Sequence, residues 1–263
     1  MELSYSQADA HAWAAFSGDF NPIHFSSTLP SGAESMAMSV HGMRALLDIK
    51  EAMTDALAPE NRPAWLRFTA RLQQPLKCGE PASLSLERRG QQINGQLQQT
   101  RCGTRCMTAR LAPGFAPEMT GIMQQGDIDA ATRSQLREGY PGVSAADKAW
   151  VFLDALLFKK LLASQAFTGE MQRAFGGHPF TSLMDIFSET GVVQTHHETL
   201  FSPSLIAASE SKTMLWGILP ALVSGDIRTG VICHITVVAW THTSPLIATS
   251  LTLKSLPVSA INQ

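Results

Sequence analysis

The sequence predicts an α+β protein made of two successive units, each with a helix followed by a meander of antiparallel strands. Apolar residues recur at helical spacing near residue 50 and again near residue 155. Short runs that alternate apolar and polar residues follow each of these stretches, and segments rich in Pro and Gly separate the two halves. The halves share no obvious sequence identity, so the repeat is inferred from the order of the elements alone.

The first unit is expected to open with a helix that begins after Ser6 and ends at Gly18. Ser6 and Asp9 have the spacing of a capping box, and Gly18 is typical of a helix C-terminus. An irregular segment rich in Ser, Pro and Gly follows over residues 19–39. A second helix is then predicted from Gly42 to about residue 57, because its apolar residues lie on one side.

Strands fill the rest of the first unit, and the second unit repeats this order. Its helix is predicted over 149–166 and has little polar face, which indicates burial on most sides. The predicted boundaries are a first unit at 1–112, a linker with partial helix at 113–145, and a second unit at 146–263. The expected strands are 65–72, 83–87, 91–99 and 106–111 in the first unit, and 180–187, 192–201, 212–219, 230–240 and 246–253 in the second.

Composition and charge argue against several classes of protein. The chain has 263 residues, of which 44% are hydrophobic and 16% charged, and its formal net charge is −2. No basic excess is present to attract nucleic acid or an anionic membrane surface. The first residues lack the basic and apolar regions of a secretory signal, and the longest apolar stretches, 151–158 and 214–223, are too short to cross a bilayer. We therefore expect a cytoplasmic protein.

The four cysteines are Cys78, Cys102, Cys106 and Cys233. A chain of this length without a secretory signal is not expected to carry a disulfide framework. Cys102 and Cys106 have the spacing of half a metal site, but no second pair of Cys or His supports them. We expect reduced thiols beside a hairpin turn and no bound metal.

The segment Gly18-Asp19-Phe20-Asn21-Pro22-Ile23-His24 is the most informative for function. Gly18 permits a sharp turn after the first helix, and Asn21-Pro22 disfavours helix and fixes one backbone angle. Asp19 and His24 therefore lie on either side of a rigid bend, which can bring a carboxylate and an imidazole to one small-molecule position. Such a pair can exchange protons near neutral pH, because histidine titrates there.

A second feature is His41-Gly42, at the start of the second predicted helix. A helix N-terminus presents unpaired backbone N–H groups and the positive end of the helix dipole. These groups can hold a carbonyl oxygen as it gains negative charge. His41 can contact a substrate or cap the helix, and the sequence leaves both readings open. Together with the pair on the bend, these residues supply what proton transfer next to a carbonyl requires.

The pattern Gly18-Asp19-x-Asn21-Pro22-x-His24, followed by Gly42, resembles the MaoC-like or hydratase-2 group of the hot-dog superfamily. This group includes (R)-specific enoyl-thioester hydratases and 3-hydroxyacyl-thioester dehydratases. Leu66-Arg-Phe-x-x-x-Leu-x-x-Pro-x-x-x-Gly-Glu80 resembles the strand and turn after the family's central helix, so the resemblance covers residues 1 to about 112. It implies a double hot-dog fold, with two antiparallel sheets each wrapped on a central helix. The second half lacks the Gly-Asp-x-Asn-Pro-x-His pattern and resembles a degenerate partner.

By this resemblance, Asp19 and His24 position and activate the water, or the departing hydroxyl, at C3 and relay the proton at C2. Asn21 shapes the loop near the site, and the N–H of Gly42 donates to the thioester carbonyl, with His41 beside it. The implied substrate is an acyl chain linked to CoA or to acyl carrier protein, with no metal or other cofactor. The chain would be a pseudo-dimer in itself. A further homodimer, the acyl length, the direction, and a fatty-acid, polyhydroxyalkanoate or polyketide pathway stay open.

Two departures distinguish the chain from the family's pattern. Some members carry a hydroxyl residue in the central helix that supports the catalytic Asp, whereas this chain has Lys50 there, with Asp48 nearby. The segment between His24 and His41 also lacks the aromatic residues often seen in it, which predicts an acyl pocket of distinctive shape. Three methionines are expected to fill the core or line an acyl tunnel, namely Met36, Met38 and Met43.

Two other functions stay open. A hot-dog thioesterase would rely on a helix carboxylate, for which Asp48 or Glu51 are candidates, and an acyl-binding or assembly subunit would need no catalytic pair. The remaining polar features are interpreted as structural. They are His178 in a turn, Lys159-Lys160 at the wet end of the second buried helix, and His196-His197-Glu198 at solvated positions of a strand.

Overall fold

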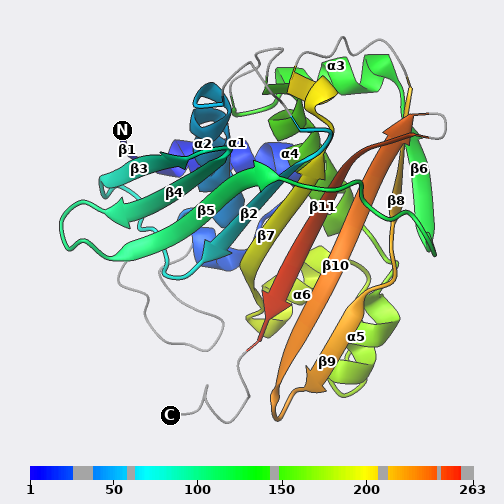
Figure 1. The fold of residues 1–263 in the computed structure, drawn as a ribbon. Coiled ribbons are helices and arrows are strands. Elements are labelled where there is room, and N and C mark those ends of the chain that lie inside the picture. Colours follow the sequence, from blue (N-terminus) through cyan, green and yellow to red (C-terminus); the bar gives the residue numbers. More distant parts are fainter. Residues whose placement is uncertain (26–37, 58–62, 143–147, 207–212, 242–243, 256–263) are drawn as a thin grey trace.

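The structure is a computed structural model that describes residues 1–25, 38–57, 63–142, 148–206, 213–241 and 244–255. Its strands form one antiparallel sheet, and helices lie behind that sheet in Figure 1. The strands are β1 (Glu2–Leu3), β2 (Leu66–Leu72), β3 (Ala82–Arg89), β4 (Gln92–Gln99), β5 (Arg105–Pro113), β6 (Gln124–Ile128), β7 (Val193–Phe201), β8 (Met214–Ile218), β9 (Leu222–Asp226), β10 (Gly230–Thr241) and β11 (Ser244–Lys254). The helices are α1 (Gln7–Ser17), α2 (Gly42–Asp55), α3 (Ala130–Glu138), α4 (Ala149–Leu162), α5 (Thr168–Ala174) and α6 (Leu183–Thr190), with the 3-10 helices η1 (Pro22–His24) and η3 (Pro203–Ile206).

The order of the strands shows two similar units that meet in the middle of the sheet. From edge to edge the order is β1-β3-β4-β5-β2-β7-β11-β10-β8-β6, and β9 pairs with β10. Outwards from the antiparallel pair β2–β7, β5 matches β11, β4 matches β10, β3 matches β8 and β1 matches β6. In the same way α1 matches α3, and α2 matches α4 (Figure 1). This is the double hot-dog fold expected from the sequence, with α2 and α4 as central helices.

The second unit begins earlier than the sequence indicates. Residues 113–145 are predicted to be a linker with partial helix, but β6 in that segment pairs with β8 over its whole length. α3 follows directly, and Asp129 caps it by accepting the N–H of Thr132 at 2.6 Å. β6 and α3 therefore belong to the second unit, in the places that β1 and α1 have in the first.

The central helix of the second unit is surrounded by other parts of the protein, as its composition predicts. Every residue of α4 except Lys159 and Lys160 is buried. Trp150 on this helix stacks on Phe201 of β7, with ring centroids 4.1 Å apart and planes at 3°. Complete burial of a side chain such as that of Phe201 contributes about 2 kcal/mol to folding. The core of the molecule thus lies between the two central helices and the curved sheet.

The predicted helices and most of the predicted strands are confirmed, but the prediction of a strand at 180–187 is wrong. This segment contains the start of α6, and Ser182 caps that helix by accepting the N–H of Asp185 at 3.2 Å. Its apolar residues are buried at helical spacing, namely Leu183, Ile186 and Phe187. The run is short and apolar, and such runs fit a strand and a buried helix equally well. α5, β1, β6 and β9 were not predicted, and each has at most seven residues.

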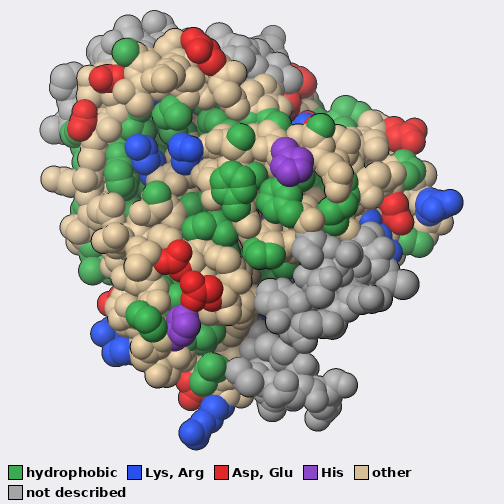
Figure 2. Space-filling model, turned by 180° about the vertical axis from the view of Figure 1, so that it is seen from behind, with side chains coloured by type: hydrophobic (Ala, Val, Ile, Leu, Met, Phe, Trp, Pro, Cys, Tyr) green, Lys and Arg blue, Asp and Glu red, His purple; other side chains and the backbone are tan. Residues whose placement is uncertain are grey.

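The helical side of the molecule is seen in Figure 2, from behind the view of Figure 1. Apolar side chains gather near the middle of this face, and acidic and basic side chains are interspersed around them. None of the helices in the described part of the chain combines the length and the apolar character needed to span a membrane.

Candidate active site

Short-range hydrogen bonds hold the bend between α1 and η1. Gly18 follows α1 with a φ of 85°, a left-handed conformation that glycine adopts without strain. The N–H of Asp19 donates to Ser17 Oγ (3.0 Å), and the N–H of Asn21 donates to Asp19 Oδ1 (3.3 Å). Asn21 also caps η1, because its Oδ1 accepts the N–H of Ile23 at 3.3 Å. The shape of this loop is thus determined by its own residues.

The bend brings the side chains of Asp19 and His24 together, and His41 joins them from the start of α2. One nitrogen or carboxylate oxygen from each of the three residues lies within 4.8 Å of the other two. All three are buried, with exposed fractions of 6% for Asp19, 8% for His24 and 1% for His41. A carboxylate and an imidazole therefore share one small volume away from bulk solvent.

His24 is held in one tautomer. Its Nδ1 lies 2.8 Å from the backbone oxygen of Ser39, which can only accept a hydrogen bond. Nδ1 therefore carries the proton, and Nε2 has the free lone pair. Burial lowers the pKa of His24 to about 4. The ring is accordingly neutral at pH 7, and its Nε2 can act as a base.

The pKa of Asp19 shifts in the opposite direction. Burial raises the pKa of this carboxyl to about 6, against a smaller lowering by the N–H of Asn21. Asp19 is therefore mostly ionised at pH 7, yet it takes up a proton more readily than an exposed carboxylate does. A carboxylate and an imidazole that are both unprotonated near neutral pH can receive a proton from a substrate and return it.

His41 supports the pair from behind. Its Nε2 donates to the backbone oxygen of Asp19 at 3.0 Å, and its ring stacks on that of His24 with centroids 3.7 Å apart. Its Nδ1 is buried and has no hydrogen-bond partner among the described residues. Burial lowers the pKa of His41 to about 3. His41 is absent from the described residues that line the adjoining cavity. Its position therefore favours support of the loop over substrate contact.

Asp19, His24 and His41 also have the chemistry of a cation site, with one carboxylate and two imidazoles. The rings of His24 and His41 are stacked with planes 27° apart, and each holds a backbone oxygen with one of its nitrogens. A cation at this place would therefore be held by a carboxylate oxygen of Asp19, Nε2 of His24 and Nδ1 of His41.

A cavity of about 260 Å³ opens beside Asp19 and His24. Gly42 lines this cavity as the first residue of α2, where backbone N–H groups have no partner within the helix. A Cβ at Gly42 would lie 2.3 Å from Cδ2 of Leu72, so glycine allows the helix to approach this wall closely. The remaining wall is largely apolar and comes from both units, with Met43, Leu72, Met107, Phe158, Phe187, Val192 and Gln194 among its residues.

The second unit closes this cavity through α6 and the start of β7. Phe187 lies on α6, and Gln194 is the second residue of β7. Neither residue is among the site residues predicted from the sequence. Helical spacing of apolar residues within 183–187 is the signal by which α6 could have been found, whereas no pattern in the sequence marks Gln194. Of the three methionines, Met43 lines the cavity, Met38 is half-buried, and Met36 lies outside the described residues.

The prediction that His196, His197 and Glu198 are solvated is wrong for His197. Neighbouring residues of a strand point to opposite faces, and His197 points inward, with 1% of its surface exposed. His196 is exposed, and Glu198 forms an ion pair with Arg67 across the sheet. The reason for the burial of His197 is a charged partner, Asp154 on α4, at 3.0 Å.

The other polar candidates lie outside the cavity. Among the described residues that line it, neither Asp48 nor Glu51 appears. Asp48 accepts hydrogen bonds from the hydroxyl of Tyr5 (2.7 Å) and from Arg44 (2.9 Å), and Glu51 is buried within the core side of α2. His178 is exposed and contacts Glu189. The four cysteines are all free thiols.

No protein-family model matches the chain, and no curated protein matches it. Similar solved structures include the dehydratase domain of PpsC from Mycobacterium tuberculosis in complex with C12:1-CoA (14% identity, 84% of this chain and 86% of that chain, TM-score 0.44). They also include the acyl-CoA thioesterase II TesB2 from Mycobacterium marinum (12% identity, 84% and 91%, TM-score 0.47). A third is a conserved protein of unknown function with hot dog fold from Alicyclobacillus acidocaldarius (12% identity, 89% and 90%, TM-score 0.43). At these low TM-scores, the double hot-dog assignment rests on the strand order of this chain.

Proposed function

We propose that this chain is a lyase of the MaoC-like, hydratase-2 type, which adds water to acyl thioesters or removes it from them. The observation that carries this proposal is the buried pair of Asp19 and His24 at the wall of a largely apolar cavity. The N-terminus of α2, with Gly42, borders the same cavity. The substrates are 3-hydroxyacyl and trans-2-enoyl chains on CoA or on acyl carrier protein.

Dehydration then proceeds by the movement of one proton. The N–H of Gly42 holds the thioester oxygen, which gains negative charge as the C2 proton leaves. His24 Nε2 takes this proton, with Asp19 beside it, and the pair delivers it to the C3 hydroxyl. The hydroxyl departs as water with the electron pair of its C–O bond, and the double bond forms between C2 and C3. Hydration is the reverse, and the pair ends each cycle in its starting state.

The two alternatives have less support. A thioesterase that relied on Asp48 or Glu51 would need one of these carboxylates at the cavity, and neither lines it within the described residues. A subunit that only binds acyl chains would need the cavity but not the buried carboxylate of Asp19, whose ionisation is made unfavourable by burial. A carboxyl group whose pKa is shifted by burial at the wall of a cavity is a candidate functional residue.

Incubation of the purified full chain with crotonyl-CoA separates the three possibilities. We expect the absorbance of the conjugated enoyl thioester to fall without release of free thiol. Release of thiol at the rate at which the absorbance falls would identify the chain as a hydrolase instead of a lyase. A constant absorbance, together with measurable binding of acyl-CoA, would replace it with a binding subunit.

A further inference from the structure

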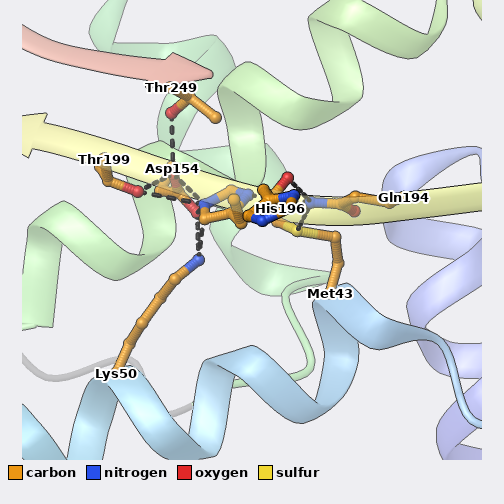
Figure 3. A network of polar contacts seen from close by, with 8 residues as sticks. Met43, Lys50, Asp154, Gln194, His196, Thr199 and Thr249 are labelled. Carbon is orange, nitrogen blue, oxygen red and sulfur yellow. Dashed lines mark hydrogen bonds and ion pairs between the residues drawn. The ribbon is translucent and has the colours of Figure 1, made fainter. Parts of the chain in front are cut away.

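A cluster of buried polar side chains joins the two units near the cavity (Figure 3). Lys50 on α2 forms an ion pair with Asp154 on α4, and both side chains are fully buried. Asp154 also accepts hydrogen bonds from the hydroxyls of Thr199 on β7 and Thr249 on β11, each at 2.7 Å. Burial alone would raise the pKa of Asp154, but its contacts with His197 and Lys50 lower it. Asp154 is therefore a carboxylate at neutral pH.

This carboxylate determines which nitrogen of His197 carries the proton. The Nε2 of His197 lies 3.0 Å and 3.2 Å from the two oxygens of Asp154, which can only accept. The Nζ of Lys50 also lies 3.1 Å from this Nε2, but it donates to Asp154, so the two donors share one carboxylate. Nε2 is therefore protonated, and Nδ1 has the lone pair. The Nε2 of Gln194 lies 3.2 Å from that Nδ1 and 3.3 Å from the backbone oxygen of His196. Both partners of this amide nitrogen are acceptors, so the cluster also determines which way the amide of Gln194 is turned.

The amide oxygen of Gln194 is left for a ligand. Gln194 lines the same cavity as Asp19 and His24. Its amide nitrogen lies 3.8 Å from the sulfur of Met43, next to Gly42 at the start of α2. No described residue donates a hydrogen bond to Oε1 of Gln194. A hydrogen-bond acceptor of fixed orientation thus lies close to the end of the cavity where the thioester would be held.

We propose that Gln194 is a substrate-positioning residue whose Oε1 accepts a hydrogen bond from an O–H or N–H group of the acyl thioester. The buried cluster of Lys50, Asp154 and His197 holds the amide in this orientation. The inference rests on the proposed function, because it takes an acyl thioester as the ligand. Two groups of such a substrate have this chemistry, the 3-hydroxyl of the acyl chain and the amide N–H of the pantetheine arm.

Calorimetric binding measurements test this inference. Asp19→Asn serves as background, because it slows turnover of the ligand, and butyryl-CoA and 3-hydroxybutyryl-CoA are the probes. Gln194→Met, which keeps the size of the side chain and removes the acceptor, is expected to weaken binding about tenfold. Gln91→Met is the matched control, because Gln91 is exposed and is absent from the described residues that line the cavity. Loss confined to 3-hydroxybutyryl-CoA identifies the 3-hydroxyl as the donor, and equal loss with both probes identifies the pantetheine N–H. Unchanged binding of both probes overturns the inference.

A second pair of variants tests whether His197 acts through Gln194. A glutamine at position 197 can extend an N–H towards Asp154 but offers no acceptor at the place of Nδ1. An asparagine can offer an oxygen near that place but does not reach Asp154. We expect His197→Gln to retain thermal stability and weaken binding about tenfold, and His197→Asn to lose stability and retain binding. If His197 only stabilised the fold, the less stable variant His197→Asn would bind more weakly than His197→Gln. This result would show that His197 does not act through Gln194.

The failure of this inference differs from the failure of the proposed function. If the wild-type chain leaves crotonyl-CoA unchanged while Gln194→Met still weakens acyl-CoA binding, the lyase reaction is refuted and Gln194 keeps its role in binding. If the wild-type chain hydrates crotonyl-CoA and Gln194→Met has the wild-type KM, kcat and affinity, the lyase stands and the role of Gln194 is refuted.

Discussion

At the scale of single residues, burial shifts the pKa values of Asp19 and His24 in opposite directions and leaves both able to receive a proton at pH 7. We expect Asp19→Asn and His24→Ala to lower turnover of crotonyl-CoA at least about 10²-fold, because each removes one member of the proposed proton relay. His178→Ala is a suitable control, since His178 is exposed and contacts Glu189. Circular dichroism of each variant checks that the fold is retained. Wild-type rates in both Asp19→Asn and His24→Ala would show that the pair is not catalytic.

The raised pKa of Asp19 also predicts how stability depends on pH. A carboxyl whose pKa is about 6 in the folded protein and 3.8 in the unfolded chain stabilises the fold below pH 4, and that contribution is lost as pH rises to about 6. The full difference corresponds to about 3 kcal/mol. We therefore expect Asp19→Asn to unfold at higher urea concentration than the wild type at pH 8 and at nearly the same concentration at pH 4. Equal differences at the two pH values would contradict the raised pKa.

The sequence predicts the bend of the site and misses the residues opposite to it, for a physical reason. Asp19 and His24 are brought together by turns and caps formed within a few residues, so local chemistry is sufficient to place them. His197 is buried because of Lys50, which lies 147 positions away in the chain, and Asp154. Contacts between residues so far apart in the chain depend on the whole fold, and no local pattern in the sequence indicates them.

At the scale of elements, the N-terminus of α2 supplies the proposed donor to the thioester oxygen. Proline is well tolerated at the first residue of a helix but has no backbone N–H. Gly42→Pro therefore removes the donor, whereas Gly42→Ala keeps it and introduces the same contact with Leu72. We expect kcat of Gly42→Pro to be about 10²- to 10³-fold lower than that of Gly42→Ala, the usual effect of losing one oxyanion donor. Equal rates in the two variants would exclude this N–H from the mechanism.

The elements that were predicted correctly have local signals. The capping box of α1 is one, since Ser6 Oγ accepts the N–H of Asp9, and Asp9 accepts the N–H of Ser6 at 2.8 Å. Burial alternates along the whole of β4, and sharp turns separate β3, β4 and β5. α6 was missed although Ser182 caps it, because its run of apolar residues is short and fits a strand equally well. Sequence pattern is thus reliable where a cap precedes a run of apolar residues that is long enough to show its spacing.

At the scale of the whole molecule, the two units differ in the segments that they contribute to the cavity. In the first unit, residues 18–41 separate the two helices and carry Asp19 and His24, whereas in the second unit only residues 139–148 separate α3 from α4. The second unit instead inserts α5 and α6 between its central helix and β7. The first unit therefore places Asp19 and His24 at the cavity, and the second unit adds Phe187, as part of the apolar wall, and the amide of Gln194.

The ion pair between Lys50 and Asp154 connects these two units, and its removal should affect the whole molecule. Both side chains are fully buried, so removal of one partner leaves the other as an uncompensated charge in the core. We expect Lys50→Met and Asp154→Leu each to lower the free energy of unfolding by about 3–5 kcal/mol. The double variant should lose at least about 2 kcal/mol less than the sum, because it leaves no unpaired charge. Urea unfolding followed by fluorescence measures these values, and strictly additive losses would show that the pair is not coupled across the interface.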